Sequence, residues 1–327
     1  MENSIRVGIV GYGNLGKGVE IAIHRNPDLK LVGVFTRRDP STIQTVFPGV
    51  EVFTYDEMEK FTDKIDVMVL CGGSASDLPT MSPEIVAKFN IVDSFDNHSK
   101  IPAHIEKVDR VAKESGKVGV VSVGWDPGLF SMNRLLGEIV LPTGGTHTFW
   151  GEGLSQGHSE AVRRIEGVKA GVQYTVPIDL ILEKARAGEG AELTGADRHK
   201  RVCYVVADEK DQTRIENEIK TMPDYFAPYD TTVHFISEEE LKQNHSKMKH
   251  GGFVIRSGNT SDDNQATVEF ALALDSNPEF TASVLVAYAR AAYHLNKRGE
   301  TGAKTAFDIP LSVMTNKSSA EIYKDLL

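Results

Sequence analysis

The 327-residue chain has only two cysteines, Cys71 and Cys203, and no apolar run that approaches the length of a membrane span. Two cysteines far apart in the sequence give no CxxC pair and no disulfide framework, which fits a reducing compartment. A spanning helix needs about 20 consecutive, mostly apolar residues. No signal peptide is expected, since the first predicted strand begins near residue 5. We therefore expect a cytoplasmic protein without a membrane partner.

Positive charge and metal-ligand patterns are also scarce. Lysine and arginine number 36 against 46 aspartates and glutamates, so the net charge is −10, which argues against nucleic acid or an anionic membrane as a partner. The ten histidines form no HExxH motif and no cluster with cysteine at ligand spacing, so we expect no metal. The length and the ordinary hydrophobic content, 40%, allow two domains with a large core.

The most informative stretch that is present lies at residues 6–16. An apolar run typical of a buried parallel strand leads directly into Gly11-Tyr12-Gly13-Asn14-Leu15-Gly16, and an apolar pattern at helical spacing follows. In a strand–turn–helix that binds pyrophosphate, the first glycine makes the turn, the second admits the phosphates and the third lets helix and strand pack closely. The helix N-terminus then offers N–H groups to the anion. A glycine turn without a ligand is the alternative, but a second apolar strand at residues 31–35 completes the dinucleotide-binding pattern.

The residues after that second strand indicate which dinucleotide binds. An NAD site usually carries an Asp or Glu there, which accepts hydrogen bonds from the ribose 2′-hydroxyl. This chain has Thr36-Arg37-Arg38 instead. Guanidinium groups and a hydroxyl suit a 2′-phosphate, which a carboxylate would repel. We predict NADP as the cofactor; the alternative is that the two arginines are a solvated surface pair.

Strands and helices alternate through the first third of the chain. One helix is predicted to begin at Ser82-Pro83-Glu84 and another at Pro102, and further strands are predicted at residues 65–70, 91–93 and 118–122. This alternation predicts an α/β fold with a Rossmann-type, doubly wound parallel sheet. Ligands bind beyond the carboxyl ends of the strands in such a sheet.

Two of those strand ends carry unusual side chains, Asp96 and the pair Trp125-Asp126. They are candidates for the reacting centre. A turn or capping role is the alternative for either aspartate.

The second half of the chain has a different pattern. Strand-like runs with hairpin-like returns, interrupted by helices at residues 178–187 and 212–221, indicate an α+β domain with a mainly antiparallel sheet. The runs are at residues 146–150, 171–176, 202–206, 231–236, 253–257 and 267–274. We predict a nucleotide-binding domain at residues 1–124, on which residues 300–327 pack back, and a substrate and dimerisation domain at residues 125–299. A long apolar helix near residues 281–297 is expected in the core and is expected to pack back on the first domain.

Polar groups gather at three places in that second domain. Residues 153–158 and 249–252 are predicted to be glycine-rich loops, and residues 199–201 are predicted to begin a strand. Arg201 and His250 are donors of the kind that bind a carboxylate, with Thr175 as a third. Each could singly be a surface residue. Together with Asp96 and Asp126 they predict a zwitterionic substrate, in which carboxylates meet Arg and His and an ammonium meets Asp.

The sequence resembles the meso-diaminopimelate D-dehydrogenase family over essentially its whole length. The stretches around Trp125 and Trp150 and the run Ser155-Gln156-Gly157-His158 are more specific than the glycine fingerprint. The resemblance is carried by residues 11–16, 35–38, 96–98, 124–128, 147–151, 153–158, 172–175, 199–201, 221–226, 250–252, 277–278 and 280–283.

The resemblance implies a homodimer that catalyses the reversible, NADP-dependent oxidative deamination of the D-centre of meso-2,6-diaminopimelate to L-2-amino-6-oxopimelate and ammonia. The residues it implies around the reacting end are Asp96, Trp125, Asp126 and Trp150; those lining the pocket are Gln156 and Gly157; those holding the distal end are Thr175, Arg201, His250 and Asn277. Besides the fingerprint and Thr36, Arg37 and Arg38, the residues expected to border the cofactor are Cys71, Gly72, Gly73, Ser74, Ser94, Phe95, Asp96, Val123, Gly124, Trp125, Asp126 and Pro127.

Asp96 or Asp126 is our candidate for taking a proton or steering water, and the sequence leaves the choice open. The chain departs from the family pattern at Lys100, where some members carry an acid, so no proton-relay role applies there.

Two other functions are alternatives for this sequence. A different two-domain NADP reductase, similar to dihydrodipicolinate reductase, is disfavoured by the Trp125-Asp126 motif. A non-catalytic NADP-sensing protein is disfavoured by the dense polar motifs of the second domain, because buried polar groups without a ligand are costly.

Overall fold

The computed structural model describes residues 4–189, 193–223 and 225–327. Asp224, in one of the family-like stretches, therefore lies outside the described residues. The chain forms two compact units, the first from residues up to 132 together with 278–327, and the second from residues 133–277. Among the described residues, no helix is both long and apolar enough to cross a membrane.

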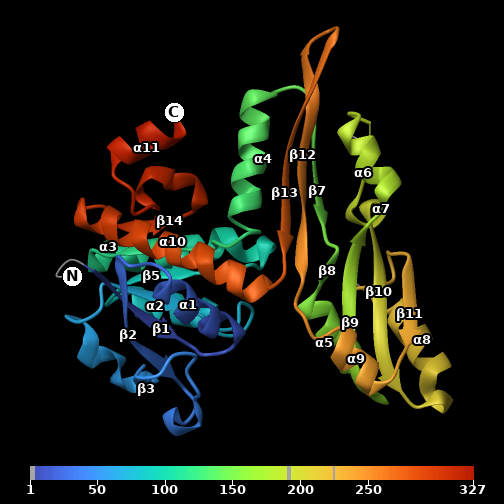
Figure 1. Cartoon of the computed structure of the whole chain (residues 1–327), viewed down its shortest axis with the longest axis horizontal. Helices are drawn as coiled ribbons and strands as arrows, with labels where there is room; N and C mark the ends of the chain where they lie inside the picture. Colours follow the sequence, from blue (N-terminus) through green and yellow to red (C-terminus); the bar gives the residue numbers. More distant parts are fainter. Residues whose placement is uncertain (1–3, 190–192, 224) are drawn as a thin grey trace. The chain divides into compact units, whose positions relative to one another are not determined.

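The first unit is built on a seven-stranded sheet in the order β14-β6-β5-β4-β1-β2-β3, and every neighbouring pair is parallel. This confirms the predicted Rossmann-type sheet. Figure 1 labels β1, β2, β3, β5 and β14 of this sheet. The strands are β1 Ile5–Val10, β2 Leu29–Thr36, β3 Val52–Thr54, β4 Val67–Leu70, β5 Asn90–Asp93, β6 Val118–Val120 and β14 Gly302–Lys304.

Helices cover both faces of this sheet because apolar side chains of its strands alternate between two cores. Val67 and Val69 of β4 share one core with α1 (Asn14–His24) and α10 (Asn277–Lys297). Met68 and Leu70 share the other with α2 (Leu78–Val86) and α3 (Ile101–Ser115). Side chains along a strand point alternately to its two faces, and a parallel sheet is buried on both.

The start of α2 differs from the sequence prediction. The helix begins at Leu78, with Pro79 in its first turn, and Pro83 lies inside it. The prediction that a helix begins at Ser82 is therefore wrong. Pro83 has no N–H for the carbonyl of Pro79, and the Nζ of Lys107 donates to that carbonyl at 2.9 Å instead. The prediction for α3 is confirmed, since Pro102 lies in its first turn and Gly116, at φ 68°, ends it.

Short elements complete the first unit. They are the helix α11 (Ser319–Leu326) and the 3₁₀ turns η1 Pro40–Thr42, η2 Tyr55–Phe61, η3 His98–Lys100, η5 Ala306–Asp308 and η6 Leu311–Val313. The long helix α10 belongs to this unit from Pro278 onward. The reason is its apolar surface, which includes the fully buried Leu285 and Tyr288.

The second unit contains two sheets rather than one. Four strands follow the order β11-β10-β9-β8 and three follow β13-β12-β7. All pairs are antiparallel except β10 with β11, which is parallel. The strands are β7 Gly145–Trp150, β8 Gly153–Leu154, β9 Val168–Pro177, β10 His199–Ala207, β11 Thr231–Phe235, β12 His250–Ser261 and β13 Asn264–Leu274.

Helices of the second unit cover one face of the four-stranded sheet through a core that joins Val162, Ile215 and Ile219 to Cys203 and Val205 of β10. A smaller core joins β7 and β12 to α6. The helices are α4 Leu129–Val140, which begins in the first unit, α5 Gln156–Arg163, α6 Asp179–Arg186, α7 Gly195–Arg198, α8 Gln212–Thr221 and α9 Glu238–Asn244, with a 3₁₀ turn η4 at Glu209–Asp211.

Candidate nucleotide and substrate sites

The glycine turn after β1 has the geometry that a pyrophosphate site needs. Gly11 adopts φ +87°, and its N–H donates to the carbonyl of Phe35 at 2.9 Å. A Cβ on Gly16 would lie 2.4 Å from the carbonyl oxygen of Gly11, so helix and turn pack too closely for any side chain there. A Cβ on Gly13, by contrast, would meet no protein atom within 4 Å. Gly13 caps α1 without a side-chain hydrogen bond, so the helix begins at an open space suited to an anion.

A hollow of about 290 Å³ lies at this turn in the first unit. It is bounded by the ends of β1 and β2, the loop after β4 and the start of α2. Nine of the predicted cofactor residues line it: Gly11, Tyr12, Gly13, Thr36, Arg37, Arg38, Cys71, Gly72 and Gly73. Asn14, Leu15 and Gly16 form the first turn of α1. The fingerprint and the residues after β2 and β4 are therefore brought together.

The two arginines at this hollow are held by different partners. Arg37 forms an ion pair with Asp77 at 2.7 Å, although 63% of its side chain is exposed. The Nη2 of Arg38 donates to the carbonyl of Tyr12, and the Arg38 N–H donates to the hydroxyl of Thr36 at 3.1 Å. Burial opposes ionisation of Asp77, but hydrogen bonds from Arg37 and from the Gly73 N–H hold its pKa below the usual range. The sequence reasoning missed Asp77.

Tyr12 of the fingerprint is tied to a buried carboxylate, Glu20, which the sequence reasoning also missed. The Tyr12 hydroxyl donates to Glu20, and Glu20 accepts the N–H groups of Phe47 at 2.8 Å and Val46 at 3.1 Å. Burial and the contact with Glu20 raise the pKa of Tyr12. The Tyr12 side chain is therefore held against α1 at the turn.

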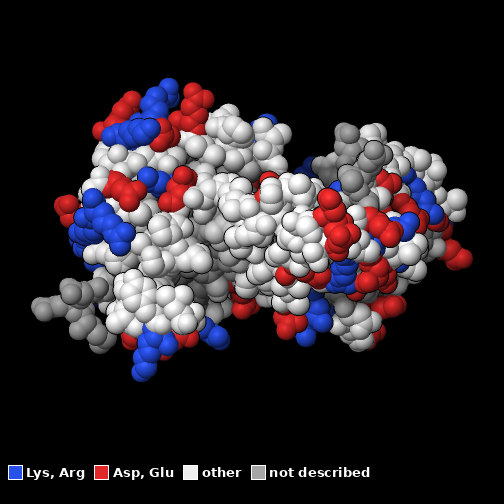
Figure 2. Space-filling view, turned by 90° about the horizontal axis from the view of Figure 1, so that it is seen from above, with Lys and Arg blue, Asp and Glu red and all other residues white. Residues whose placement is uncertain are grey.

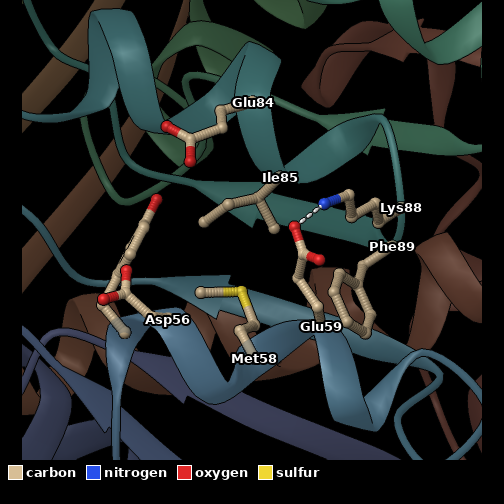
Figure 3. Close-up of a pocket in the computed structure, with 8 residues that line it drawn as sticks. Asp56, Met58, Glu59, Glu84, Ile85, Lys88 and Phe89 are labelled. Carbon is tan, nitrogen blue, oxygen red and sulfur yellow. Dashed lines mark hydrogen bonds and ion pairs between the residues drawn. The ribbon is translucent and has the colours of Figure 1, made fainter.

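A second hollow, of about 310 Å³, lies between η2 and α2 (Figure 3). Met58, Ile85 and Phe89 form its apolar part, and Lys88 pairs with Glu59 across it. None of the predicted site residues lines this hollow, so we do not assign it to the nucleotide.

The loops after β5 and β6 carry the candidates for the reacting centre. Asp96 is exposed, and its N–H donates to the hydroxyl of Ser74 at 2.9 Å, so two predicted cofactor residues meet there. Trp125 is buried and contacts Phe130 edge-on at 5.2 Å between ring centroids. Asp126 is half-buried. Of the other predicted residues on these loops, Phe95, Val123 and Gly124 are buried, and Ser94 and Pro127 are partly exposed.

In the second unit, a buried cation lies at one end of the four-stranded sheet. Arg201 of β10 is opposite Thr175 of β9, and its Nη1 donates to the Thr175 hydroxyl. Its guanidinium lies over the ring of Tyr229, 3.9 Å from the centroid. Arg201 is only 7% exposed, its Nε has no hydrogen-bond partner among the described residues, and none of their carboxylates forms an ion pair with it. Burial lowers its pKa.

Further predicted residues gather near Thr175. Gly153 pairs with Thr175 across β8 and β9, and a Cβ on Gly153 would lie 2.4 Å from the His250 ring, so glycine is required for His250 to lie there. The Nε2 of Gln156 donates to the sulfur of Met248 at 3.3 Å, and the Asn277 N–H donates to the Met248 carbonyl at 3.0 Å. Thr175, Arg201, His250, Gln156 and Asn277 are thus linked around one part of the second unit.

Two predicted loops there have regular structure instead. Residues 153–154 form β8, and α5 begins at Gln156, with Gly157 exposed in its first turn. The strand β12 already begins at His250, so the prediction of a loop over residues 249–252 is wrong apart from Lys249. Hydrogen bonds explain both: the Leu154 N–H donates to the Lys249 carbonyl at 2.9 Å, and the Ser159 N–H donates to the Ser155 carbonyl at 3.0 Å. The predicted strand start at His199 is confirmed.

Trp150 is held by a neutral histidine. The Trp150 N–H donates to the Nε2 of His199 at 2.8 Å, so His199 carries its proton on Nδ1 and donates it to the Gly195 carbonyl at 3.0 Å. The two rings stack at 5.5 Å. Burial, and also the nearby Arg201 and Arg198, lower the pKa of His199 to about 4. Burial and Arg201 likewise lower the pKa of His158 to about 4.

A Rossmann-type sheet with a glycine turn, joined to an α+β unit that buries a cation, is typical of two-domain nucleotide-dependent dehydrogenases. Comparison with known proteins identifies the family. The sequence profile described as the diaminopimelic acid dehydrogenase C-terminal domain matches residues 124–276. The chain is 60% identical over 326 residues to the meso-diaminopimelate D-dehydrogenase of Lysinibacillus sphaericus, covering 99% of this chain and 100% of the relative.

Solved structures agree over the full length. The C. glutamicum DAP dehydrogenase in complex with DAP is 46% identical, with a TM-score of 0.92, and covers 99% of this chain and 100% of its own. An engineered D-amino acid dehydrogenase bound to NADP⁺ is 44% identical, with a TM-score of 0.86 and the same coverage. The chain belongs to the meso-diaminopimelate D-dehydrogenase family, which confirms the resemblance recognised in the sequence.

Proposed function

We propose that this protein catalyses the reversible, NADP-dependent oxidative deamination of the D-centre of meso-2,6-diaminopimelate, giving L-2-amino-6-oxopimelate and ammonia. The observation that carries the proposal is the buried guanidinium of Arg201, which has Thr175 and Tyr229 as partners but no carboxylate among the described residues. A buried cation without a counter-ion is costly, so this group is suited to receive a carboxylate from a ligand. The names of the relatives and the DAP complex of one of them support the same substrate.

The residues of the first unit fit a phosphorylated dinucleotide. The open space at Gly13 and the start of α1, where no side chain caps the helix, suit the pyrophosphate. Arg37 and Arg38 line the same hollow, where a 2′-phosphate would need cations. When bound, the nicotinamide accepts a hydride from the substrate carbon. The loop residues Ser74, Ser94–Asp96 and Val123–Pro127 are proposed to border it, because they follow strands of the sheet at the edge where such cofactors bind.

Recognition of the substrate is proposed to start at its distal, L-configured end. Arg201 and Thr175 would hold the carboxylate, and His250 and Asn277 would contact the remaining polar groups of that end. Gln156 and Gly157 would line the substrate pocket. Anchors at one end only allow one hand of the other end to meet the cofactor, so the stereochemical choice follows from position.

Asp96, Trp125, Asp126 and Trp150 are each proposed to contact the reacting end. The amine must lose a proton before hydride leaves the adjacent carbon, and water must then add to the resulting iminium before ammonia departs. Asp96 and Asp126 are the carboxylates available for the proton and for orienting the water. Asp96 is exposed and Asp126 is half-buried, so water can reach Asp96 directly.

We also propose a homodimer and a cytoplasmic location. The helix α4 exposes Leu136, Ile139 and Val140, which are 52%, 67% and 51% accessible and lie at spacings that place them on one face. An apolar helix face of this kind suits a second copy of the chain. Both cysteines are free thiols, which is consistent with a reducing compartment.

The proposal is tested by following absorbance at 340 nm with purified protein, meso-diaminopimelate and either NADP⁺ or NAD⁺. We expect NADPH and ammonia to form in equal amounts and NAD⁺ to be a poor acceptor. Tight NADP⁺ binding without turnover of any amino acid would instead identify a sensor. Turnover of a dihydropyridine substrate would identify a reductase of the alternative kind.

A further inference from the structure

The last residue of β5, Asp93, is a buried carboxylate that joins the two loops on which the candidate aspartates lie. It is completely inaccessible to solvent. An ionised carboxylate is costly to bury unless its oxygens are fully hydrogen-bonded. Asp93 meets that condition through both side-chain oxygens, and its partners come from four separate segments of the first unit.

One side-chain oxygen binds the loops. Oδ1 accepts the N–H of Phe95 at 3.1 Å and the N–H of Ser122 at 2.9 Å. The backbone carbonyl of Asp93 accepts the N–H of Val123 at 3.1 Å. Phe95 immediately precedes Asp96, and Ser122 and Val123 lead into Gly124-Trp125-Asp126. One residue therefore fixes the chain on both sides of the proposed reacting centre.

The other side-chain oxygen contacts the helices α2 and α3. Oδ2 accepts the hydroxyl of Ser82 in α2 at 2.6 Å and contacts the Nε2 of His104 in α3 at 2.8 Å. Because an ionised carboxylate only accepts hydrogen bonds, the proton in the second contact belongs to His104. The His104 ring also stacks on Phe95, with centroids 4.3 Å apart. The loops are thus tied through Asp93 to the two helices that cover this face of the sheet.

The backbone of Ser122 adopts an unfavourable conformation that the hydrogen bond to Asp93 helps to maintain. Ser122 is the non-glycine residue with positive φ among those described, at 55°. Its own hydroxyl is buried without a hydrogen-bond partner among the described residues. A left-handed conformation at a residue with a side chain is unfavourable and persists only where surrounding contacts impose it. The bond from Ser122 N–H to Asp93 is such a contact.

We infer that Asp93 is a positioning residue that sets the relative placement of Asp96 and of Trp125-Asp126, and so the rate of the chemical step. The inference rests on the proposed function for its kinetic part. Loss of the hydrogen bonds to Asp93 lets the loops after β5 and β6 move. A displacement of about 1 Å at a reacting centre can cost on the order of a hundredfold in rate.

The first test is kinetic. Asp93→Ala removes the acceptor of the Phe95 and Ser122 N–H groups, and we expect kcat to fall about a hundredfold while Kd for NADP⁺ changes threefold or less. Asp93→Asn should recover to within about tenfold of wild type. Its amide oxygen can still accept both N–H groups, and Ser82 and His104 can turn to accept from its nitrogen. If Asp93→Ala is folded and its kcat lies within twofold of wild type, the inference is wrong.

A matched control separates positioning from general loss of stability. Asp66 precedes β4 at the opposite, amino-terminal edge of the sheet and accepts three hydrogen bonds from Arg6. Asp66→Ala should lower the melting temperature but keep kcat within twofold at 25 °C. An equal loss of kcat in Asp66→Ala would overturn the inference. If Asp93→Ala does not fold, Ser82→Ala takes its place: a fall in kcat of threefold or more supports the inference, and an unchanged kcat refutes it.

A second readout does not depend on turnover. The chain has two tryptophans, so Trp150→Phe leaves Trp125 as the single indole reporter. Trp125 is buried, and we expect Asp93→Ala in that background to raise its acrylamide quenching constant at least twofold, with no change in Asp66→Ala. Unchanged quenching would contradict the inference. If Asp93→Ala raises the quenching as expected but the wild type does not turn over meso-diaminopimelate, the proposed function fails while the positioning role stands.

Discussion

At the scale of single residues, the guanidinium of Arg201 should have the largest effect on substrate affinity. Replacing it with Met keeps the length of the side chain and removes the charge and the donors. We expect Arg201→Met to raise KM for meso-diaminopimelate about a hundredfold, because losing a charged hydrogen-bonded contact to a buried carboxylate typically costs a few kcal/mol. Steady-state kinetics with saturating NADP⁺, together with a titration of NADP⁺ alone, measure the two affinities separately.

The control for this change is Arg163→Met on α5, a more exposed arginine paired with Glu160. It should leave KM within twofold of wild type. If Arg201→Met weakens NADP⁺ and the substrate equally, the assignment of Arg201 to the distal carboxylate is wrong.

The lowered pKa of His199 should make the free energy of unfolding depend on pH. Folding lowers its pKa from about 6.5 to about 4 by burial, so between these values the folded protein binds fewer protons than the unfolded chain. This contribution is fully present above about pH 6.5 and is lost as the pH falls toward 4. Protonation of Nε2 would also break the bond from the Trp150 N–H. We expect His199 alone to reduce the free energy of unfolding by about 2 kcal/mol at pH 5.

Urea unfolding of wild type and His199→Gln at pH 7 and pH 5 tests this. Glutamine stays neutral over this range. The free energy of unfolding of His199→Gln should therefore fall by about 2 kcal/mol less than that of wild type between the two pH values. Equal falls in both proteins would show that His199 is not held neutral by the fold.

Some site residues could be predicted from the sequence and others could not, for a physical reason. Asp96 and Trp125-Asp126 directly follow recognisable strands, and strand ends are where ligands bind in such a sheet. Asp77 and Glu20 gain their roles from partners far along the chain: Asp77 pairs with Arg37, and Glu20 accepts the N–H groups of Val46 and Phe47. A single acid at a helix start or inside a helix gives no sign of such long-range contacts.

At the scale of elements, the glycine turn and α1 offer a matched pair of substitutions. Gly13→Ala adds a Cβ that meets no protein atom within 4 Å, so the melting temperature should stay within about 2 °C of wild type. The same methyl group would occupy the space assigned to the pyrophosphate, so Kd for NADP⁺ should rise at least tenfold. Gly16→Ala would place its Cβ 2.4 Å from the Gly11 carbonyl, and it should lower stability by about 1–3 kcal/mol as well as weaken NADP⁺.

Thermal unfolding with and without NADP⁺ distinguishes these two variants. A stable Gly13→Ala protein that binds NADP⁺ as tightly as wild type would refute the placement of the pyrophosphate at α1.

The starts of α2, β8 and α5 differ from the positions predicted from the sequence. Ser82-Pro83 has the pattern of a helix start, yet α2 continues through Pro83 because Lys107 supplies the hydrogen bond that the proline leaves unmade. Gly153 and Gly157 gave residues 153–158 the look of a loop. The strand β8 and the helix α5 form there because neighbouring strands and the buried Val162 stabilise them, and no local pattern contains that information.

At the scale of the whole molecule, the parallel sheet was predictable because each strand–helix repeat is local in sequence. The division of the second half into two sheets was not, because β7 pairs with β12 more than a hundred residues later, and the alternating pattern of a strand does not reveal its partner. The packing of α10 on the first unit was predictable, because its apolar composition marks it as a core helix.

The proposed dimer gives a prediction at this scale. Replacing Leu136 and Ile139 together with Lys places two charges on the exposed apolar face of α4. Sedimentation velocity at micromolar concentration should then show a monomer, while wild type and the control Leu311→Lys, an equally exposed leucine of the first unit, remain dimers. A dimeric double variant, or a monomeric wild type, would refute α4 as the interface.

The central claim of the proposed function is that one end of a doubly charged diacid is bound so that only the D-centre at the other end meets the nicotinamide. The most direct measurement is the initial rate of NADPH formation with meso-, L,L- and D,D-diaminopimelate at equal concentrations. We predict rapid turnover of the meso isomer and rates at least a hundredfold lower for the other two. Comparable rates for all three isomers, or the fastest turnover with the L,L isomer, would contradict the account.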